Sequence, residues 1–158
     1  MSTNSSNSNT RSGSGKITAT IGNGFPHPDY AGVPRFFIHG NNKIVLRTVD
    51  FIDKAGTQTG MNWVFPNDIE NRRYEFVKDA PYHIEPLEFS YRSFNEDLKE
   101  WVGTTYLKEN IGYIDVKDFN LEQGHLKADF SFQFTTYKDP KTHTVSGTID
   151  VTGLVKEP

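Results

Sequence analysis

The chain has 158 residues, a net charge of −3, no cysteine and 13% aromatic residues. This length suits one domain that buries roughly 68–70% of its unfolded surface. The lack of cysteine excludes disulfides, thiolate catalysis and cysteine-ligated zinc or iron–sulfur sites. The net charge is slightly negative, so the sequence does not indicate the basic face that nucleic-acid-binding proteins usually carry. No apolar run reaches about 18 residues, so no transmembrane helix is predicted, and no signal peptide is visible.

The N-terminal segment differs in composition from the rest of the chain. Residues 1–15 are Ser, Asn, Thr and Gly with one Arg, and no apolar residue follows Met1. Such a segment cannot bury enough apolar surface to offset the entropy of ordering. We therefore predict a disordered tether over residues 1–15 and a single β domain over residues 16–158.

Strands are predicted where apolar and polar residues alternate, because successive side chains of a strand point to opposite faces. Phe25 to Pro34 contains three prolines, and this predicts an irregular loop because proline cannot donate to a ladder. In chain order the predicted strands are Lys16–Ile21, Arg35–His39, Lys43–Phe51, Met61–Phe65, Arg73–Lys78, Tyr82–Arg92, Glu100–Leu107, Ile111–Phe119, Gly124–Tyr137 and His143–Val151.

Turns and short helices are predicted from local spacing. Gly40-Asn41-Asn42, Asn120–Gln123 and Lys138–Lys141 have the composition of hairpin turns. Asn67–Glu70 and Ser93–Glu96 have capping-box spacing, so we expect one helical turn at the first and a helix of about two turns at the second.

Apolar spacing supports the second helix and also predicts a bulge. Phe94, Leu98 and Trp101 stand at i, i+4 and i+7 after the second capping box. A change of apolar phase at Glu85-Pro86 predicts a bulge in that strand. The predicted fold is all-β, an antiparallel β-sandwich or flattened barrel of about ten strands with one or two short helical turns.

The order of the strand motifs suggests a family. Lys16–Gly22 is followed, near the other end, by Gly112–Phe119, Ala128–Phe132 and Val145–Val151. This order resembles a family of small uncharacterised lipoproteins and secreted proteins of Bacteroidetes, which open on F-T-A-x-I-n-G and close on three strand motifs rich in Gly and Phe.

The chain departs from that family in three respects. Phe25-Pro26 follows the opening motif where the family continues to a Trp, Ala128 replaces a Gly, and the lipid-bearing Cys is missing. The resemblance implies a β fold and an extracytoplasmic location, with lipid attachment at the cell surface in a native precursor. It implies no activity.

Motifs for catalysis and metal binding are missing from the sequence. The five histidines include no HxH or HxxxH pair, and neither GxSxG nor GxGxxG occurs. We therefore predict no catalytic residue, no metal and no cofactor. His27 and Asp29 are the best candidates for a His/carboxylate pair. Asp50 and Asp53 would complete a loop-built hydrolase site, which is the alternative hypothesis.

Tyrosines are the remaining indication of function. Tyr106, Tyr113 and Tyr137 fall out of phase with the apolar face or near strand ends. Exposed Tyr rings can stack on sugars or dock a protein, although they can also simply cover sheet edges. The leading prediction is a non-enzymatic binding or surface-accessory module for a glycan, a lipid or a protein, with these tyrosines, His27 and Asp29 as candidate binding residues. A purely structural subunit is a further alternative.

Overall fold

The computed structural model describes residues 13–157 except 79, 82, 104 and 138–139. In these residues every regular secondary-structure element is a β-strand, so the predicted all-β class is confirmed. The strands are β1 (Ser14–Ile21), β2 (Asp29–Gly40), β3 (Lys43–Phe51), β4 (Gln58–Pro66), β5 (Arg73–Glu75), β6 (Pro86–Asn95), β7 (Glu100–Val102), β8 (Thr105–Asn120), β9 (His125–Thr136), β10 (His143–Thr152) and β11 (Val155–Lys156).

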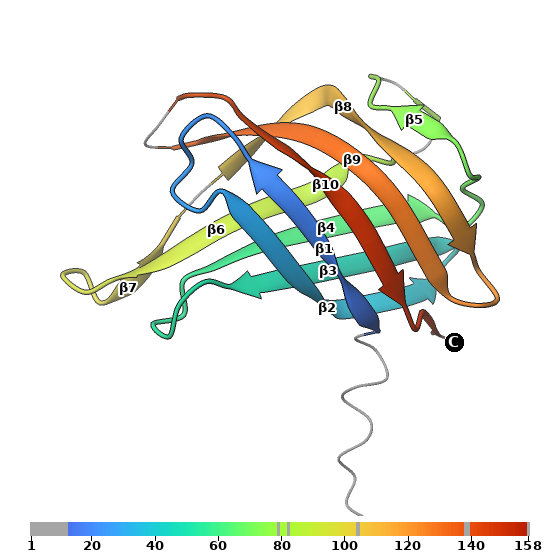
Figure 1. Ribbon diagram of the computed structural model, residues 1–158, viewed down its shortest axis with the longest axis horizontal. Coiled ribbons are helices and arrows are strands. Elements are labelled where there is room, and N and C mark those ends of the chain that lie inside the picture. The colour runs from blue at the N-terminus through green and yellow to red at the C-terminus, as the bar shows by residue number, and fades with distance from the viewer. Residues whose placement is uncertain (1–12, 79, 82, 104, 138–139, 158) are drawn as a thin grey trace, which may run out of the picture.

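One sheet contains all of these strands. Its order is β5-β8-β9-β10-β1-β2-β3-β4-β6-β7, and the neighbours in this order are antiparallel, while β11 adds to β2 in parallel. Figure 1 shows the sheet curling so that β8, β9 and β10 cross in front of β3, β4 and β6. The fold is therefore a flattened half-barrel. One layer contains β8, β9 and β10, the other contains β3, β4 and β6, and one hydrophobic core lies between them.

Aromatic rings from both layers form the centre of the core. On β9 the predicted alternation holds, and Phe130, Phe132 and Phe134 are all buried. The Trp63 ring of β4 meets Phe130 edge-on at 5.4 Å between centroids. The Phe89 ring of β6 lies 4.6 Å from that of Phe134. Edge-to-face and tilted rings of this kind add to the stability gained from buried area.

The two ends of the sheet are short strands, which limit edge-to-edge association. β5 pairs only with Tyr113–Asp115 of β8, and β7 pairs only with Ser93–Asn95 of β6. The two sides of the half-barrel approach each other where Pro86–Phe89 of β6 faces Thr105–Ile111 of β8, and we call this region the seam. No ladder joins β6 to β8 in the described residues. Instead, the Thr105 hydroxyl donates a hydrogen bond to the carbonyl of Phe89.

The two predicted helical segments are wrong. Asn67–Glu70 lies in a turn, where the Glu70 amide donates to the Tyr74 hydroxyl at 2.9 Å. In place of the second helix, β6 runs on to Asn95 and returns as β7. Lys99 takes a positive φ of 54° in the connecting turn. Pairing between the two strands satisfies the backbone there, and it overrides the local helical spacing.

The N-terminal boundaries also differ from the predictions. The irregular loop ends at Pro28, because β2 already begins at Asp29. Pro34 lies inside β2 at a register shift of the β2–β3 ladder, where a missing N–H is tolerated. Ser14 and Gly15 pair with β10, so β1 includes the last two residues of the predicted tether. Residues 1–12 of that tether lie outside the described residues.

Other boundaries follow the predicted pattern more closely. Asn41 and Asn42 take positive φ values of 51° and 60° in the predicted hairpin turn. The predicted bulge is present in β6, because Asn62 pairs with Glu88 and Trp63 with Pro86, which leaves Leu87 as the extra residue. The predicted Arg73–Lys78 strand shortens to β5. The Lys138–Lys141 turn includes residues 138–139, which are outside the described ranges.

Tyr30 of β2 carries a buried hydroxyl. Its oxygen lies 2.6 Å from Thr48 Oγ1, and both side chains are buried. The tyrosine covers Gly32, where an added Cβ would overlap the phenol. Burial raises the pKa of Tyr30 well above its ordinary value of 10.0, although the hydrogen bond to Thr48 acts in the opposite direction.

The raised pKa predicts a loss of stability in alkali. The folded-state pKa is above the unfolded one, so this contribution is complete below about pH 10 and falls as the pH rises further. Tyr30→Phe should cost about 1–2 kcal/mol at pH 7, because Thr48 keeps an unpaired buried hydroxyl. The variant should also lose less stability than wild type between pH 7 and about pH 11 in urea denaturation. An equally steep alkaline loss would contradict the assignment.

The facing of β9 predicts a contrast between two neighbours. Phe132→Ala removes a buried ring and should cost about 3–5 kcal/mol from lost transfer free energy and a residual cavity. Gln133→Ala should cost less than about 1 kcal/mol, because Gln133 lies on the other face and is only half-buried. Chemical denaturation measures both values, and equal losses would contradict this facing or the strand itself.

Candidate functional site

A cleft of about 440 Å³ opens along the seam between β6 and β8. Its floor is made of core aromatic rings, Phe76, Phe89 and Phe132. Its rim includes Leu87 and Tyr106, which are 50% and 52% exposed. Apolar side chains thus line the cleft from the core up to the solvent, as in most ligand sites.

An excursion of β8 forms one wall of the cleft. Leu107 pairs with Phe134 and Gly112 with Phe132, so the four residues between Leu107 and Gly112 stand opposite Gln133 alone. Within the excursion, Ile111 is 44% exposed and lines the cleft. An extra segment of this kind bends a strand and re-aims its side chains.

Two features fix the shape of this excursion. Asn110 has a φ of 63°, and its amide donates to Glu85 Oε1 at 2.7 Å across the seam. Gly112 has a φ of 129°, and an added Cβ there would overlap the carbonyl oxygen of Ser131. Only glycine adopts this backbone without strain so close to a neighbouring strand.

Charged side chains surround the apolar floor. The lining includes Glu88 from β6 and Lys108 and Glu109 from the excursion. Within the described part of the chain these three form no ion pair. The rim therefore offers unpaired charges of both signs beside an apolar floor, which suits a ligand that is apolar at one end and polar at the other.

The three candidate tyrosines do not form one site. Tyr106 lines the cleft. Tyr113 lies further along β8 between β5 and β9, where the Arg73 guanidinium stacks 4.0 Å from the centre of its ring. Tyr137 follows the end of β9 and is 76% exposed, but it is not part of the cleft lining.

The two members of the predicted His27–Asp29 pair have different partners. His27 is half-buried, and its Nε2 lies 3.3 Å from the Tyr91 hydroxyl. Asp29 is exposed at the start of β2, opposite Thr20 of β1. Among the described residues, no hydrogen bond or ion pair joins His27 to a carboxylate.

The carboxylates of Asp50 and Asp53 accept hydrogen bonds from backbone amides, and neither is paired with a histidine in the described residues. Asp50 accepts a hydrogen bond from the Ala31 amide at 3.0 Å. Asp53 accepts one from the Thr57 amide at 3.0 Å in the loop between β3 and β4. Hydrogen bonds from Thr57 lower the pKa of Asp53 below its ordinary value. The loop-built hydrolase site therefore has no assembled His and carboxylate in the described residues.

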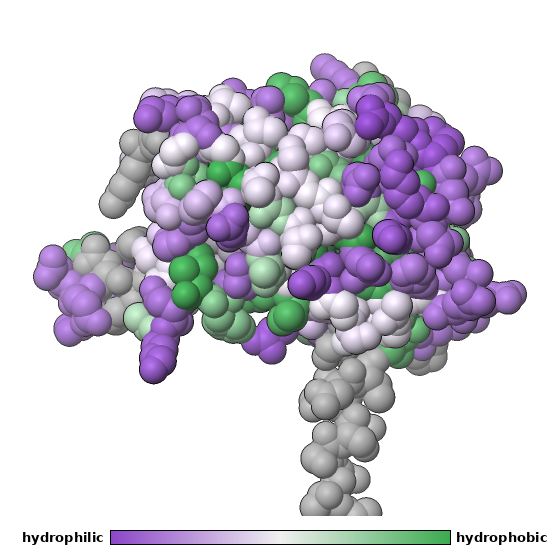
Figure 2. All heavy atoms as spheres, in the orientation of Figure 1, coloured by the Kyte–Doolittle hydropathy of each residue, from purple (hydrophilic) through white to green (hydrophobic). Residues whose placement is uncertain are grey.

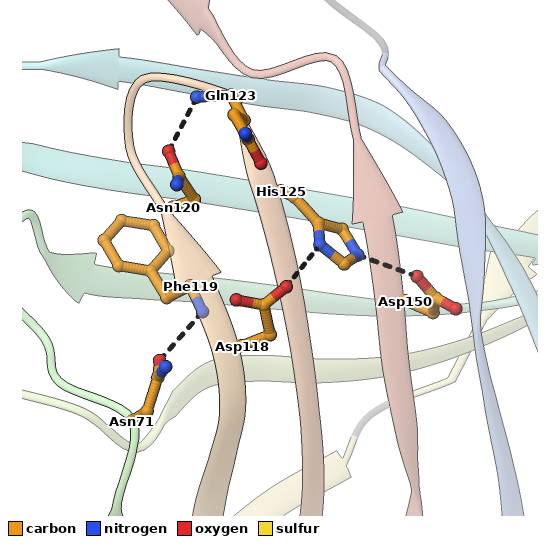
Figure 3. Close-up of polar contacts among 7 residues, drawn as sticks. All are labelled: Asn71, Asp118, Phe119, Asn120, Gln123, His125 and Asp150. Atoms are coloured by element: carbon orange, nitrogen blue, oxygen red, sulfur yellow. Dashed lines mark hydrogen bonds and ion pairs between the residues drawn. The ribbon is translucent and has the colours of Figure 1, made fainter.

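A cluster of one histidine and two aspartates lies on the outer face of the sheet, and it was not predicted from the sequence. In Figure 3 the His125 ring of β9 lies between Asp118 of β8 and Asp150 of β10. Its Nδ1 is 3.0 Å from Asp118 Oδ2 and its Nε2 is 3.2 Å from Asp150 Oδ1. The carboxylates approach opposite sides of the ring, so they cannot bind one metal ion together with the same ring nitrogen.

Further observations limit where a site can lie. In the described residues no group of three His, Asp or Glu side chains could hold a metal ion.

The hairpin beside His125 is closed by the Asn120 side chain, which accepts a hydrogen bond from the Gln123 amide at 2.8 Å (Figure 3). Figure 2 shows mostly pale residues, neither strongly apolar nor strongly polar, over β1 and β10. The seam cleft is therefore our candidate site.

Comparisons with protein-family models, with curated proteins and with solved structures find no match. The resemblance to Bacteroidetes lipoproteins thus stays a prediction. Within the described ranges, no helix has the length and apolar character required to cross a membrane.

The excursion gives a test of how the cleft wall is held. Gly112→Ala should destabilise the fold by at least about 2 kcal/mol, because it combines an unfavourable φ with a backbone clash. Gly22→Ala is the matched control, since its added Cβ would be 4.0 Å from the nearest neighbour, and it should change stability by less than about 0.5 kcal/mol. Thermal denaturation compares the two, and a neutral Gly112→Ala would contradict this wall geometry.

Proposed function

We propose that the protein is a non-enzymatic binding module that holds an apolar stretch of a protein partner in the seam cleft. The observation that carries this proposal is the cleft itself, whose aromatic floor continues into an exposed rim of Leu87, Tyr106 and Ile111. Exposed apolar side chains around a concave site favour association, because binding removes them from water.

The geometry favours a protein partner over the other two predicted ligand classes. In the described residues, aromatic rings fill the interior of the half-barrel, whereas the larger barrels that enclose a lipid keep an internal cavity. The rim adds the exposed aliphatic side chains of Leu87 and Ile111, which a protein segment with apolar side chains covers better than a sugar does. An extended protein segment can lie between the facing edges of β6 and β8 and place an apolar side chain on the floor.

The charges on the rim agree with this choice. Glu88, Lys108 and Glu109 can contact polar side chains on either side of an apolar anchor, and such rim charges guide partner selection more than affinity. The resemblance to secreted lipoproteins supports an extracytoplasmic, surface-accessory role for the module.

Selection from a displayed random-peptide library on the immobilised wild-type protein tests this function. Peptides rich in apolar residues should be enriched, and their Kd should rise at least about tenfold in Tyr106→Ala and in Leu87→Ala, because central aromatic and aliphatic anchors dominate binding. Tyr137→Ala is the control, since it removes a ring that is even more exposed than Tyr106 but lies outside the cleft lining, and it should leave the Kd unchanged.

Two outcomes would contradict the proposal. One is the absence of any enriched peptide, and the other is equal binding by the wild type and a folded Leu87→Ala/Tyr106→Ala double variant. Hydrolytic activity that disappears in His27→Ala would favour the alternative enzyme hypothesis instead.

A further inference from the structure

A second hollow, of about 340 Å³, lies on the outer face of β3, β4 and β6. The outward residues there form two neighbouring cross-strand rows. One row is Arg47, Asn62 and Glu88, and the next is Val49, Gly60 and Ser90. Gln58 and Arg92 are paired with each other further along β4 and β6. Apart from Glu88, this lining is separate from that of the seam cleft.

Gly60 keeps the centre of the hollow open. An added Cβ at this position would be 3.0 Å from Ser90 Oγ and 3.3 Å from the Thr48 carbonyl oxygen. Gly60 is not among the glycines with a positive φ, so its backbone conformation does not require glycine. Its contribution is the space that it leaves between larger neighbours on both sides.

Two arginines line the hollow on either side of Gly60. Arg47 and Arg92 are both exposed and both belong to the lining. In the part of the chain that the structure describes, neither guanidinium forms an ion pair or a hydrogen bond. Guanidinium groups bind carboxylate, sulfate and phosphate oxygens through paired N–H donors. Unpaired arginines at a concave surface therefore favour an anionic group.

The hollow also contains an acceptor that an anion alone cannot satisfy. Glu88 adds an exposed carboxylate to the same lining. A carboxylate only accepts hydrogen bonds, so the matching ligand must bring hydroxyl or amine donors as well as its negative charge. Gln58 and Ser90 add side chains that both donate and accept.

We propose that this hollow binds an acidic sugar. Its carboxylate or sulfate group contacts the guanidinium groups of Arg47 and Arg92, and its hydroxyl groups donate to Glu88 and to Ser90 Oγ. An inorganic anion lacks the donors, and a neutral sugar lacks the charge, so neither satisfies both halves of the lining. This site does not depend on the protein-binding role of the seam cleft.

Titration followed by amide NMR tests this inference with four probes: glucuronate, glucose 6-sulfate, glucose and inorganic sulfate. At least one acidic sugar should give saturable shifts at the Gly60 and Ser90 amides, with a Kd at least about tenfold lower than those of glucose and inorganic sulfate. Which acidic sugar binds more tightly identifies the acid group that the arginines prefer.

Three variants complete the experiment. Arg47→Gln and Arg92→Gln should each raise the Kd at least about tenfold while keeping the wild-type amide spectrum elsewhere. Arg35→Gln is the matched control, because this arginine lies on β2 outside the hollow and stacks 5.2 Å from the Phe51 ring. It should bind as the wild type does.

Three results would overturn the inference. The first is the absence of shifts at Gly60 and Ser90 with both acidic sugars. The second is equal affinity for glucose or for inorganic sulfate, which would show that charge and hydroxyl groups are not read together. The third is an unchanged Kd in folded Arg47→Gln and Arg92→Gln variants.

Discussion

Closure of a single curled sheet around a core of aromatic rings is the constraint on which the rest of this structure depends. Trp63 from one layer meets Phe130 and Phe132 from the other, and these contacts hold the two layers face to face. A continuous antiparallel sheet must then bring its two end regions together at a seam. The pairing there is incomplete, and the candidate binding site lies in that gap.

The seam explains several local features that would otherwise look unrelated. An open strand edge favours unwanted association, and natural proteins protect such edges with short strands and bulges. Here β5 covers part of β8, and β7 covers part of β6. A bulge turns Leu87 outward, and the Asn110 amide donates a hydrogen bond to Glu85 across the seam. The same devices that protect the edges also shape a cleft with an apolar floor.

Much of the fold can be predicted from local sequence because strand alternation and turn residues act over short distances. The inward rings of β9 and the left-handed Asn41-Asn42 turn are examples. The helix predicted after Ser93 failed because the capping box and apolar spacing carry no information about a neighbouring strand. β7 provides that neighbour, and its ladder with β6 decides the local structure.

The site was harder to predict than the fold. Tyr106 can be identified as a candidate because it falls out of phase with the apolar face. Leu87 and Ile111, which line the same cleft, cannot, because they come together only across the seam. The cluster of His125 with Asp118 and Asp150 escaped prediction for the same reason, since its members lie on three different strands. The arginine hollow depends on which residues of β3, β4 and β6 stand side by side, and this register cannot be read from any one strand.

Native-state hydrogen exchange at individual amides tests most directly whether the two sides of the half-barrel meet without a ladder at the seam. Phe130 and Phe132 lie between ladders to β8 and β10, so their amides should exchange only through global unfolding. The amides of Lys108 and Glu109 lie in the excursion, outside the ladder to β9, and should exchange orders of magnitude faster. Similar protection of both pairs would mean that the seam is fully paired and that no open cleft exists there.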